Sequence, residues 1–377
     1  MIAAGRTAKE RESLAHQNNA IMAVLERAGF EQIAPDIIQP ADIFLERSGE
    51  DIRARTFVFS DPDGNELCLR PDLTVPACRF HLSHAADAAK EARYSYLGPA
   101  FRFPDEKLSP QEFTQAGLEW FGASDAVAAE ARMLKLAISA LEAAGLSNLK
   151  VTIGDVGLFA ALLADTPMPD RWRRRLKHQF WRPQAFKALL QSFTDGGSKG
   201  RTSISDVIDS IGKQKATDAA QSWMDKHDLP QQGNRSLSDV AARLAEKLAD
   251  RSEAALPKTA SAVLESYLAL EGGAEDMAAK LAGIKGGANF AAASAAYQQR
   301  LTAMEEQGLN PKRFHFSANF GREIEYYTGF VFQVEAKGIA VAGGGRYDDM
   351  LSDLGASSRI PATGFAIHTE RVARALA

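Results

Sequence analysis

The stretch YSYLGPAFRFPDEKLSPQEFTQAGLEWF, from Tyr94 to Phe121, gives the clearest indication of the fold. Its two ends predict strands, Tyr94 to Phe103 and Glu112 to Phe121, because both are rich in aromatic residues. Pro104 to Gln111 is rich in turn residues and predicts the connecting loop. Strands that follow each other through a short loop pair as an antiparallel hairpin. The stretch therefore predicts an antiparallel sheet.

The second predicted strand has two faces of different character, because successive side chains of a strand point to opposite sides. One face is typical of a core and comprises Thr114, Ala116, Leu118 and Trp120. The other face comprises Phe113, Gln115, Gly117, Glu119 and Phe121. It places an amide and a carboxylate four residues apart, and the glycine between them leaves open volume. A buried carboxylate needs a partner, so this face suits a small polar ligand. The alternative is a strand side that faces solvent.

Other segments extend the sheet and add helices to it. Thr7 to Ala28 has apolar residues at helical spacing and predicts a helix. Thr56 to Pro71 predicts a second hairpin around the turn Pro62-Asp63-Gly64. Strand-like sequence returns late in the chain, at Phe314 to Phe316 and at Phe330 to Val334. We therefore expect an α+β fold, with an antiparallel sheet flanked by helices.

The middle of the chain has a different character. From about Thr166 to Lys312, alanine-rich helical periodicity predicts a mostly helical insertion, which the Gly/Ser-rich stretch Asp195 to Ser203 interrupts. The predicted division is a first core segment at 1–165, the insertion at 166–312 and a last core segment at 313–377.

Composition excludes several classes of protein. The net charge of −4 and pI of about 6.0 give no overall attraction for nucleic acid. No apolar run approaches the roughly 20 residues that span a bilayer, and the N-terminus is too polar for a secretory signal. The only cysteines, Cys68 and Cys78, are too few for a disulfide framework or a zinc site. We expect a cytoplasmic protein without metal.

Five separated segments, with the central hairpin counted as one, resemble the histidyl-tRNA synthetases, a family of class II aminoacyl-tRNA synthetases. In the hairpin from Tyr94 to Phe121, GPAFRFP and QAGLEWFG resemble motif 2 of that class. The other matching stretches are LRPDLTVP (Leu69 to Pro76), GREIEYYTGFVF (Gly321 to Phe332), AGGGRYDDM (Ala342 to Met350) and PATGFAIHTER (Pro361 to Arg371). The resemblance covers about Arg6 to Val156 and Phe314 to Arg371, and it implies a class II synthetase-like sheet.

The resemblance also implies a pocket that binds histidine. Asp72 and Thr74 match the segment that holds the substrate α-amino group. Gln115 and Glu119 match the positions that read the amino group and the imidazole. A carboxylate facing an imidazole N–H is a sound recognition pair.

Five further residues match functional positions of the family. Tyr326 and Tyr327 match the paired tyrosines that close the ring pocket. Arg322 matches the arginine that contacts the substrate carboxylate. Arg102 and Arg371 match the arginines that grip the ATP phosphates, and we interpret them as a vestigial phosphate site.

The sequence departs from the synthetases at the motif 2 loop. In the enzymes this loop carries several arginines, whereas here Asp105, Glu106 and Glu112 face the single Lys107. Negative charge repels a triphosphate, so we expect no efficient adenylation and assign no catalytic residue. Only Val372 to Ala377 follow the last motif, so we expect no anticodon-binding domain.

A histidine pocket without the rest of the enzyme resembles the regulatory subunits of ATP phosphoribosyltransferase, a paralogous family. The resemblance implies that L-histidine is the ligand and that no cofactor is bound. The implied partner is the short-form catalytic subunit, at the first step of histidine biosynthesis. The implied assembly is a hetero-oligomer that contains a homodimer formed through Ile37 to Pro40.

Two other functions remain open from the sequence. One is a truncated synthetase-like enzyme that activates histidine with ATP. The other is a tRNA-binding module, because Asp170 to Lys187 carries seven Lys and Arg residues against one acid. Its aromatic residues are Trp172, Phe180, Trp181 and Phe186. A helix with a buried aromatic face, or a surface for an acidic partner, would have the same pattern.

Overall fold

The computed structural model describes residues 5–47, 50–104, 111–180, 182–196, 246, 249–250, 253–321 and 326–377. Its contacts divide the chain into two compact units. Unit 1 is Met1–Asp165 with Ser266–Ala377, and unit 2 is Thr166–Glu265. The helices at 274–306 belong to unit 1 together with the sheet, and the predicted division at 166–312 stays a prediction.

The described strands are β1 (Glu31–Gln32), β2 (Ile38–Pro40), β3 (Phe57–Ser60), β4 (Glu66–Leu69), β5 (Ala92–Phe101), β6 (Glu112–Phe121), β7 (Lys150–Asp155), β8 (Glu271–Gly273), β9 (Phe314–Ser317), β10 (Phe330–Ala336), β11 (Ile339–Arg346) and β12 (Ala362–His368). The described helices of unit 1 are α1 (Ala8–Arg27), α2 (Asp42–Arg47), α3 (Glu50–Ala54), α4 (Thr74–His84), α5 (Ala126–Ala143), α6 (Val156–Asp165), α13 (Ala274–Ala282), α14 (Ala288–Glu306), the 3₁₀ turn η1 (Pro311–Arg313), α15 (Met350–Asp353) and α16 (Thr369–Leu376). Unit 2 contains α7 (Asp170–Gln179) and α8 (Pro183–Thr194), and α12 (Lys258–Leu268) crosses the boundary between the units.

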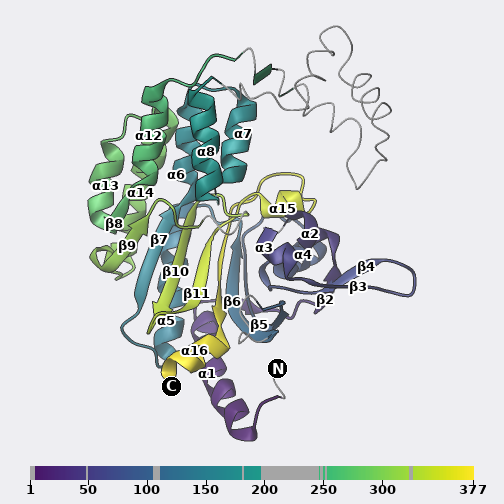
Figure 1. Cartoon of the computed structure of the whole chain (residues 1–377). Helices are drawn as coiled ribbons and strands as arrows, with labels where there is room; N and C mark the ends of the chain where they lie inside the picture. The colour runs from purple at the N-terminus through teal and green to yellow at the C-terminus, as the bar shows by residue number, and fades with distance from the viewer. Residues whose placement is uncertain are drawn as a thin grey trace. The chain divides into compact units, whose positions relative to one another are not determined.

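A nine-stranded sheet organises unit 1, in the order β1-β5-β6-β12-β11-β10-β7-β9-β8 (Figure 1). The strands from β5 to β7 pair antiparallel, as the sequence predicts. Two pairs, β1 with β5 and β7 with β9, are parallel. Parallel neighbours need a long crossover, and both pairs have helices between their strands in the sequence. A separate three-stranded sheet has the order β2-β4-β3.

The predicted local elements are confirmed. The Thr7 side chain accepts a hydrogen bond from Glu10 N, the Glu10 side chain accepts one from Thr7 N, and the helix that they cap ends before Ala28. The hairpin at Thr56 to Pro71 forms as β3 and β4, and the central hairpin forms as β5 and β6.

Helices and the small sheet cover opposite faces of the large sheet. On one side, α1 contacts β5 and β6, and α5 contacts β10, β11 and β12 (Figure 1). Trp120 of β6 packs on this side, with the Arg132 guanidinium of α5 lying 5.7 Å from its ring centroid. On the other side, Phe121 joins a buried cluster with Phe44, Cys68 and Leu351. Gln115 and Glu119 lie on this second side, because they alternate with Trp120 along β6.

No helix among the described residues is long and apolar enough to cross a membrane.

Candidate functional site

A cavity of about 260 Å³ lies on the second side of the large sheet, within unit 1. Side chains from the β4–α4 connection, β6, β12 and the segment before β10 line it. Seven of the predicted site residues are among them: Asp72, Thr74, Arg102, Gln115, Tyr326, Tyr327 and Arg371. Pockets for drug-sized ligands measure roughly 300–1,000 Å³, so this cavity suits a smaller molecule. Arg322 and residues 105–110 of the predicted motif 2 loop lie outside the described residues.

Asp72 lines this cavity and has one buried carboxylate oxygen without a partner in the described part of the chain. Its Oδ1 atom accepts a hydrogen bond from Val75 N at 3.2 Å, at the start of α4. Its Oδ2 atom is buried and has no hydrogen-bond partner among the described residues. Burial raises the pKa of Asp72, and the nearby Arg102 guanidinium opposes that rise. A buried carboxylate oxygen without a donor costs free energy, which a ligand N–H group would recover.

Glu119 is fully buried beneath the cavity and is held by two tyrosines. Tyr96 donates to Glu119 Oε1 at 2.9 Å, and Tyr347 donates to Glu119 Oε2. Burial raises the pKa of Glu119 to about 8, although hydrogen bonds from Tyr347, Thr74 and Tyr96 favour the charged form. The solvent-facing alternative for this strand side is therefore wrong, since Gln115 is also only 2% exposed.

Glycines on β12 and β6 leave space for the Glu119 carboxylate against this side of the sheet. Gly364 of β12 lies opposite Glu119, and a methyl group on Gly364 would overlap Glu119 Oε2. A methyl group on Gly117 would lie 2.7 Å from the Tyr96 hydroxyl. Both strands thus need glycine here because a side chain and a backbone approach each other closely.

The remaining polar and aromatic groups bound the cavity. Gln115 Oε1 accepts a hydrogen bond from Leu73 N at 3.2 Å, which joins β6 to the segment before α4. The rings of Tyr326 and Tyr327 lie 4.8 Å apart, and Tyr326 meets Tyr347 edge-on at 5.8 Å. An apolar wall with few polar groups is typical of a site for a ring-bearing ligand.

One part of the cavity lining is cationic. Arg102 donates to Pro71 O at 2.7 Å, and Arg371 donates to Ala340 O at 3.2 Å. Burial lowers the pKa of Arg371, and the charge of Arg102 lowers it further. Burial also holds the pKa of His368 well below its usual range, with further lowering by Arg371 and Arg102. Positive charge confined in this way favours an anionic group.

Sequence reasoning missed three residues of the site, namely Tyr96, Tyr347 and His368. Strand alternation could have found His368, because it follows Gly364 and Ala366 on the same side of β12. Tyr347 lies just after β11, where no strand periodicity remains to indicate its direction.

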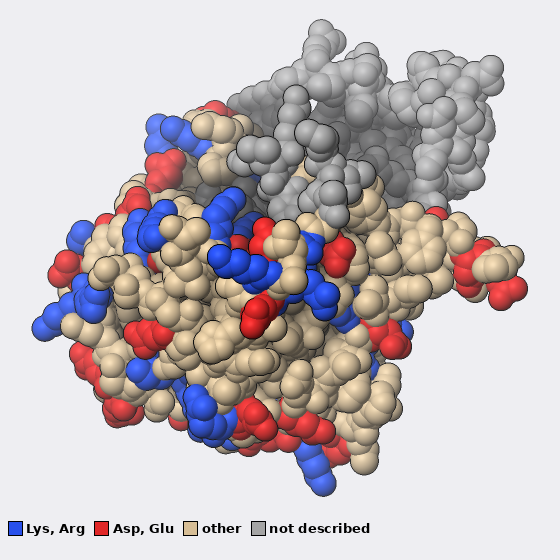
Figure 2. All heavy atoms as spheres, turned by 90° about the horizontal axis from the view of Figure 1, so that it is seen from below, with Lys and Arg blue, Asp and Glu red and all other residues tan. Residues whose placement is uncertain are grey.

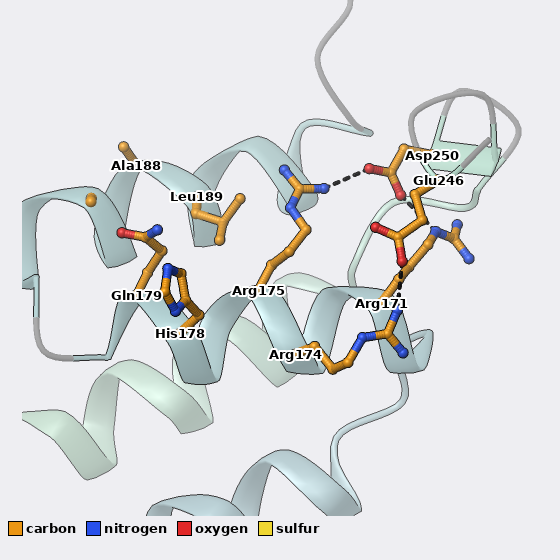
Figure 3. Close-up of a pocket in the computed structure, with 10 residues that line it drawn as sticks. Arg171, Arg174, Arg175, His178, Gln179, Ala188, Leu189, Glu246 and Asp250 are labelled. Carbon is orange, nitrogen blue, oxygen red and sulfur yellow. Dashed lines mark hydrogen bonds and ion pairs between the residues drawn. The ribbon is translucent and has the colours of Figure 1, made fainter. Parts of the chain in front are cut away.

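Three arginines of the basic segment in unit 2 pair with acidic residues of the same unit (Figure 3). Arg171 pairs with Asp250 at 2.7 Å and with Glu253 at 2.6 Å. Arg175 pairs with Asp250 at 2.6 Å, and Arg174 pairs with Glu246 at 2.5 Å. The aromatic residues Trp172, Phe180 and Phe186 are buried, and Trp181 lies outside the described residues.

These ion pairs line a cavity of about 730 Å³ and leave its arginines with carboxylate partners. On the face of the molecule in Figure 2, Lys and Arg side chains are interspersed with Asp and Glu around a broad uncharged region. The ion pairs argue against a tRNA-binding surface on α7, which needs cations available to phosphates.

Among the described residues, no group of three His, Cys, Asp or Glu side chains could hold a metal ion.

Sequence comparisons show the family of the chain, and structure comparisons show the same fold. A family model of histidyl-tRNA synthetase matches residues 6–256 and 224–372. A protein of Mesorhizobium japonicum named ATP phosphoribosyltransferase regulatory subunit is 38% identical over 347 residues, covering 89% of this chain and 91% of the relative. One of Sinorhizobium fredii with the same name is 35% identical over 370 residues, covering 95% and 96%.

Two solved structures share the fold at low sequence identity. One, from Bacillus halodurans C, is described as an ATP phosphoribosyltransferase regulatory subunit/histidyl-tRNA synthetase; it has a TM-score of 0.71 and 22% identity over 100% of this chain and 82% of its own. Histidyl-tRNA synthetase from Nostoc sp. PCC 7120 has a TM-score of 0.62 and 15% identity, covering 100% and 76%. The chain therefore belongs to the family of ATP phosphoribosyltransferase regulatory subunits, which have the histidyl-tRNA synthetase fold.

Proposed function

We propose that the cavity binds L-histidine and that the chain regulates the short-form catalytic subunit of ATP phosphoribosyltransferase without catalysing a reaction itself. The unpartnered Oδ2 atom of Asp72 is the observation that carries the histidine assignment, because it fits a cationic α-amino group. Glu119 with its tyrosines fits the imidazole, and the cationic lining around Arg371 fits the carboxylate.

Regulation requires only modest coupling between this cavity and the partner. A free-energy coupling of about 1–3 kcal/mol changes a partner's affinity roughly 5- to 150-fold. A pocket that recognises histidine can therefore report the end product of the pathway to the catalytic subunit.

The substitution Asp72→Asn is expected to weaken histidine binding about 10- to 100-fold, since a hydrogen bond to a charged group contributes about 1.5–3 kcal/mol. The variant keeps the shape of the side chain, removes its charge and replaces one acceptor oxygen with an N–H donor. Isothermal titration of the purified chain with L-histidine measures the change. Asp63→Asn, in the exposed turn between β3 and β4, is the matched control and should bind as the wild type does.

A second candidate, amino-acid activation, is favoured by one observation: Arg102 and Arg371 line the same cavity. Histidine-dependent ATP–pyrophosphate exchange separates the two functions. We expect histidine binding without exchange. Exchange above background would replace the regulatory proposal with the enzymatic one, and unchanged affinity in Asp72→Asn would place histidine elsewhere.

We further propose a homodimer within a hetero-oligomer. The small sheet exposes Ile38 at 52% and Phe59 at 39%, next to Ile37 at 40%. Exposed apolar groups clustered on one surface are typical of interfaces. Sedimentation should show a dimer that becomes a monomer on Ile38→Asp, and a larger species when the wild type is mixed with the short-form catalytic subunit. A wild-type monomer that does not combine with that subunit would contradict the assembly.

A further inference from the structure

A buried ion network lies on the helix-covered side of the large sheet, opposite the cavity. Arg300 of α14 donates to Glu130 of α5 at 2.5 Å and to Asp155 of β7 at 2.9 Å. All three side chains are almost completely buried. Buried charges of this kind are costly unless their partners stay in place, so the network fixes α14, α5 and β7 relative to one another.

The network continues to the end of β11 through a second arginine. Arg346 lies 3.6 Å from Glu130 Oε1 and forms a two-point ion pair with Asp348, at 2.7 Å through Nε and 2.6 Å through Nη2. Asp348 Oδ1 also accepts a hydrogen bond from Ala362 N at 3.0 Å. Arg346 pairs in register with Thr363, whose hydroxyl contacts Met133 of α5, so its side chain lies on the helix side.

The same short segment forms the cavity wall on the other side. Tyr347, between Arg346 and Asp348, donates to the buried Glu119. Thr328 N donates to Arg346 O at 2.8 Å, and Asp348 N donates to Thr328 Oγ1 at 3.0 Å. Thr328 directly follows Tyr327. The backbone of Arg346 and Asp348 therefore holds the end of the Tyr326–Tyr327 segment, and the same two residues flank Tyr347.

We propose that Arg346 is a positioning residue for the ligand cavity, which orients Tyr347 and Tyr327 through its pairing with Asp348 and lies beside Glu130, the buried partner of Arg300. The Arg346 side chain is not among the residues that line the cavity, because it points to the helix side of the sheet. Without its charge, Asp348 loses its two-point partner and the segment 346–348 gains freedom to move Tyr347 away from Glu119. This inference deepens the proposed histidine binding and rests on it.

The test is a double-substitution cycle on histidine affinity, measured by titration below the unfolding temperature of every variant. Arg346→Gln is expected to weaken binding about tenfold, within the range of coupling between contacting residues. Tyr347→Phe weakens binding by removing the hydroxyl contact. If Arg346 acts through Tyr347, the double variant binds about as weakly as Tyr347→Phe alone. Arg346→Lys, which keeps the charge, should restore part of the affinity.

Two further variants keep the test decisive. Arg174→Gln removes an exposed ion pair with Glu246 in unit 2 and should leave affinity unchanged. If Arg346→Gln does not fold, Glu130→Gln replaces it in the cycle with the same expected non-additivity. Additive losses, or an affinity of Arg346→Gln equal to the wild type, would overturn the positioning role while histidine binding stands. A wild type that fails to bind histidine would overturn the proposed function and this inference together.

Discussion

Replacing Gly364 by alanine is expected to destabilise the protein by about 3 kcal/mol or more, because the new methyl group has no space in the sheet. It would overlap Glu119 Oε2 and lie 2.5 Å from Leu118 O and 2.7 Å from Glu119 Cδ. Glu119 cannot move away easily, since Tyr96 and Tyr347 hold both of its oxygens. Urea unfolding followed by circular dichroism measures the loss.

Gly343→Ala is the matched control for this substitution. Gly343 also lines the cavity, but a methyl group there would meet only Phe332 O, at an ordinary 3.5 Å. Its effect on the free energy of unfolding should stay below about 1 kcal/mol. Equal urea midpoints of unfolding for the two variants would show that the sheet adjusts freely at Gly364. The close packing around Glu119 would then contribute nothing to stability.

The local elements were predictable because their signals are local. Strand alternation placed Gln115 and Glu119 on one face, and the structure buries both beneath or beside a cavity. A turn sequence placed the β3–β4 hairpin. The strand order could not be predicted in this way, since β6 pairs with β12, more than 200 residues later, and no local pattern specifies that pairing.

Part of what sequence reasoning missed depends on equally distant contacts. Tyr347 reaches Glu119 from 228 positions later, whereas Tyr96 lies in the same hairpin as Glu119, 23 positions before it. The Glu130–Arg300 pair is separated by 170 positions. Each charge looks like an ordinary surface residue of a helix until the tertiary fold buries it against its partner.

The basic segment of unit 2 shows why composition alone left several alternatives open. Its composition is typical of a nucleic-acid surface, yet Arg171, Arg174 and Arg175 are paired with acids near residues 246–253. Charge density in a sequence window reports attraction for anions only where no intramolecular carboxylate already meets it.

Glu119 should make the stability of the protein depend on pH in the neutral range. Its pKa is about 8 in the folded protein because burial disfavours the charge, whereas an unfolded chain has a glutamate pKa of about 4.3. Between these values the folded state holds a proton that the unfolded state has lost. Stability therefore falls as pH rises through this window, by about 1.4 kcal/mol per pH unit, and the contribution is fully present only below the unfolded pKa.

The substitution Glu119→Gln is accordingly expected to remove this slope, because glutamine keeps the shape of the neutral carboxyl group and does not titrate. The difference in unfolding free energy between Glu119→Gln and the wild type should grow in favour of the variant by about 4 kcal/mol between pH 5 and pH 8. Urea unfolding at several pH values measures it, and taking the difference cancels every other titrating group. Glu142→Gln, at an exposed position near the end of α5, should follow the wild-type profile. A constant difference across the range would mean that Glu119 is ionised in the folded protein, held so by the hydroxyl groups of Tyr96 and Tyr347.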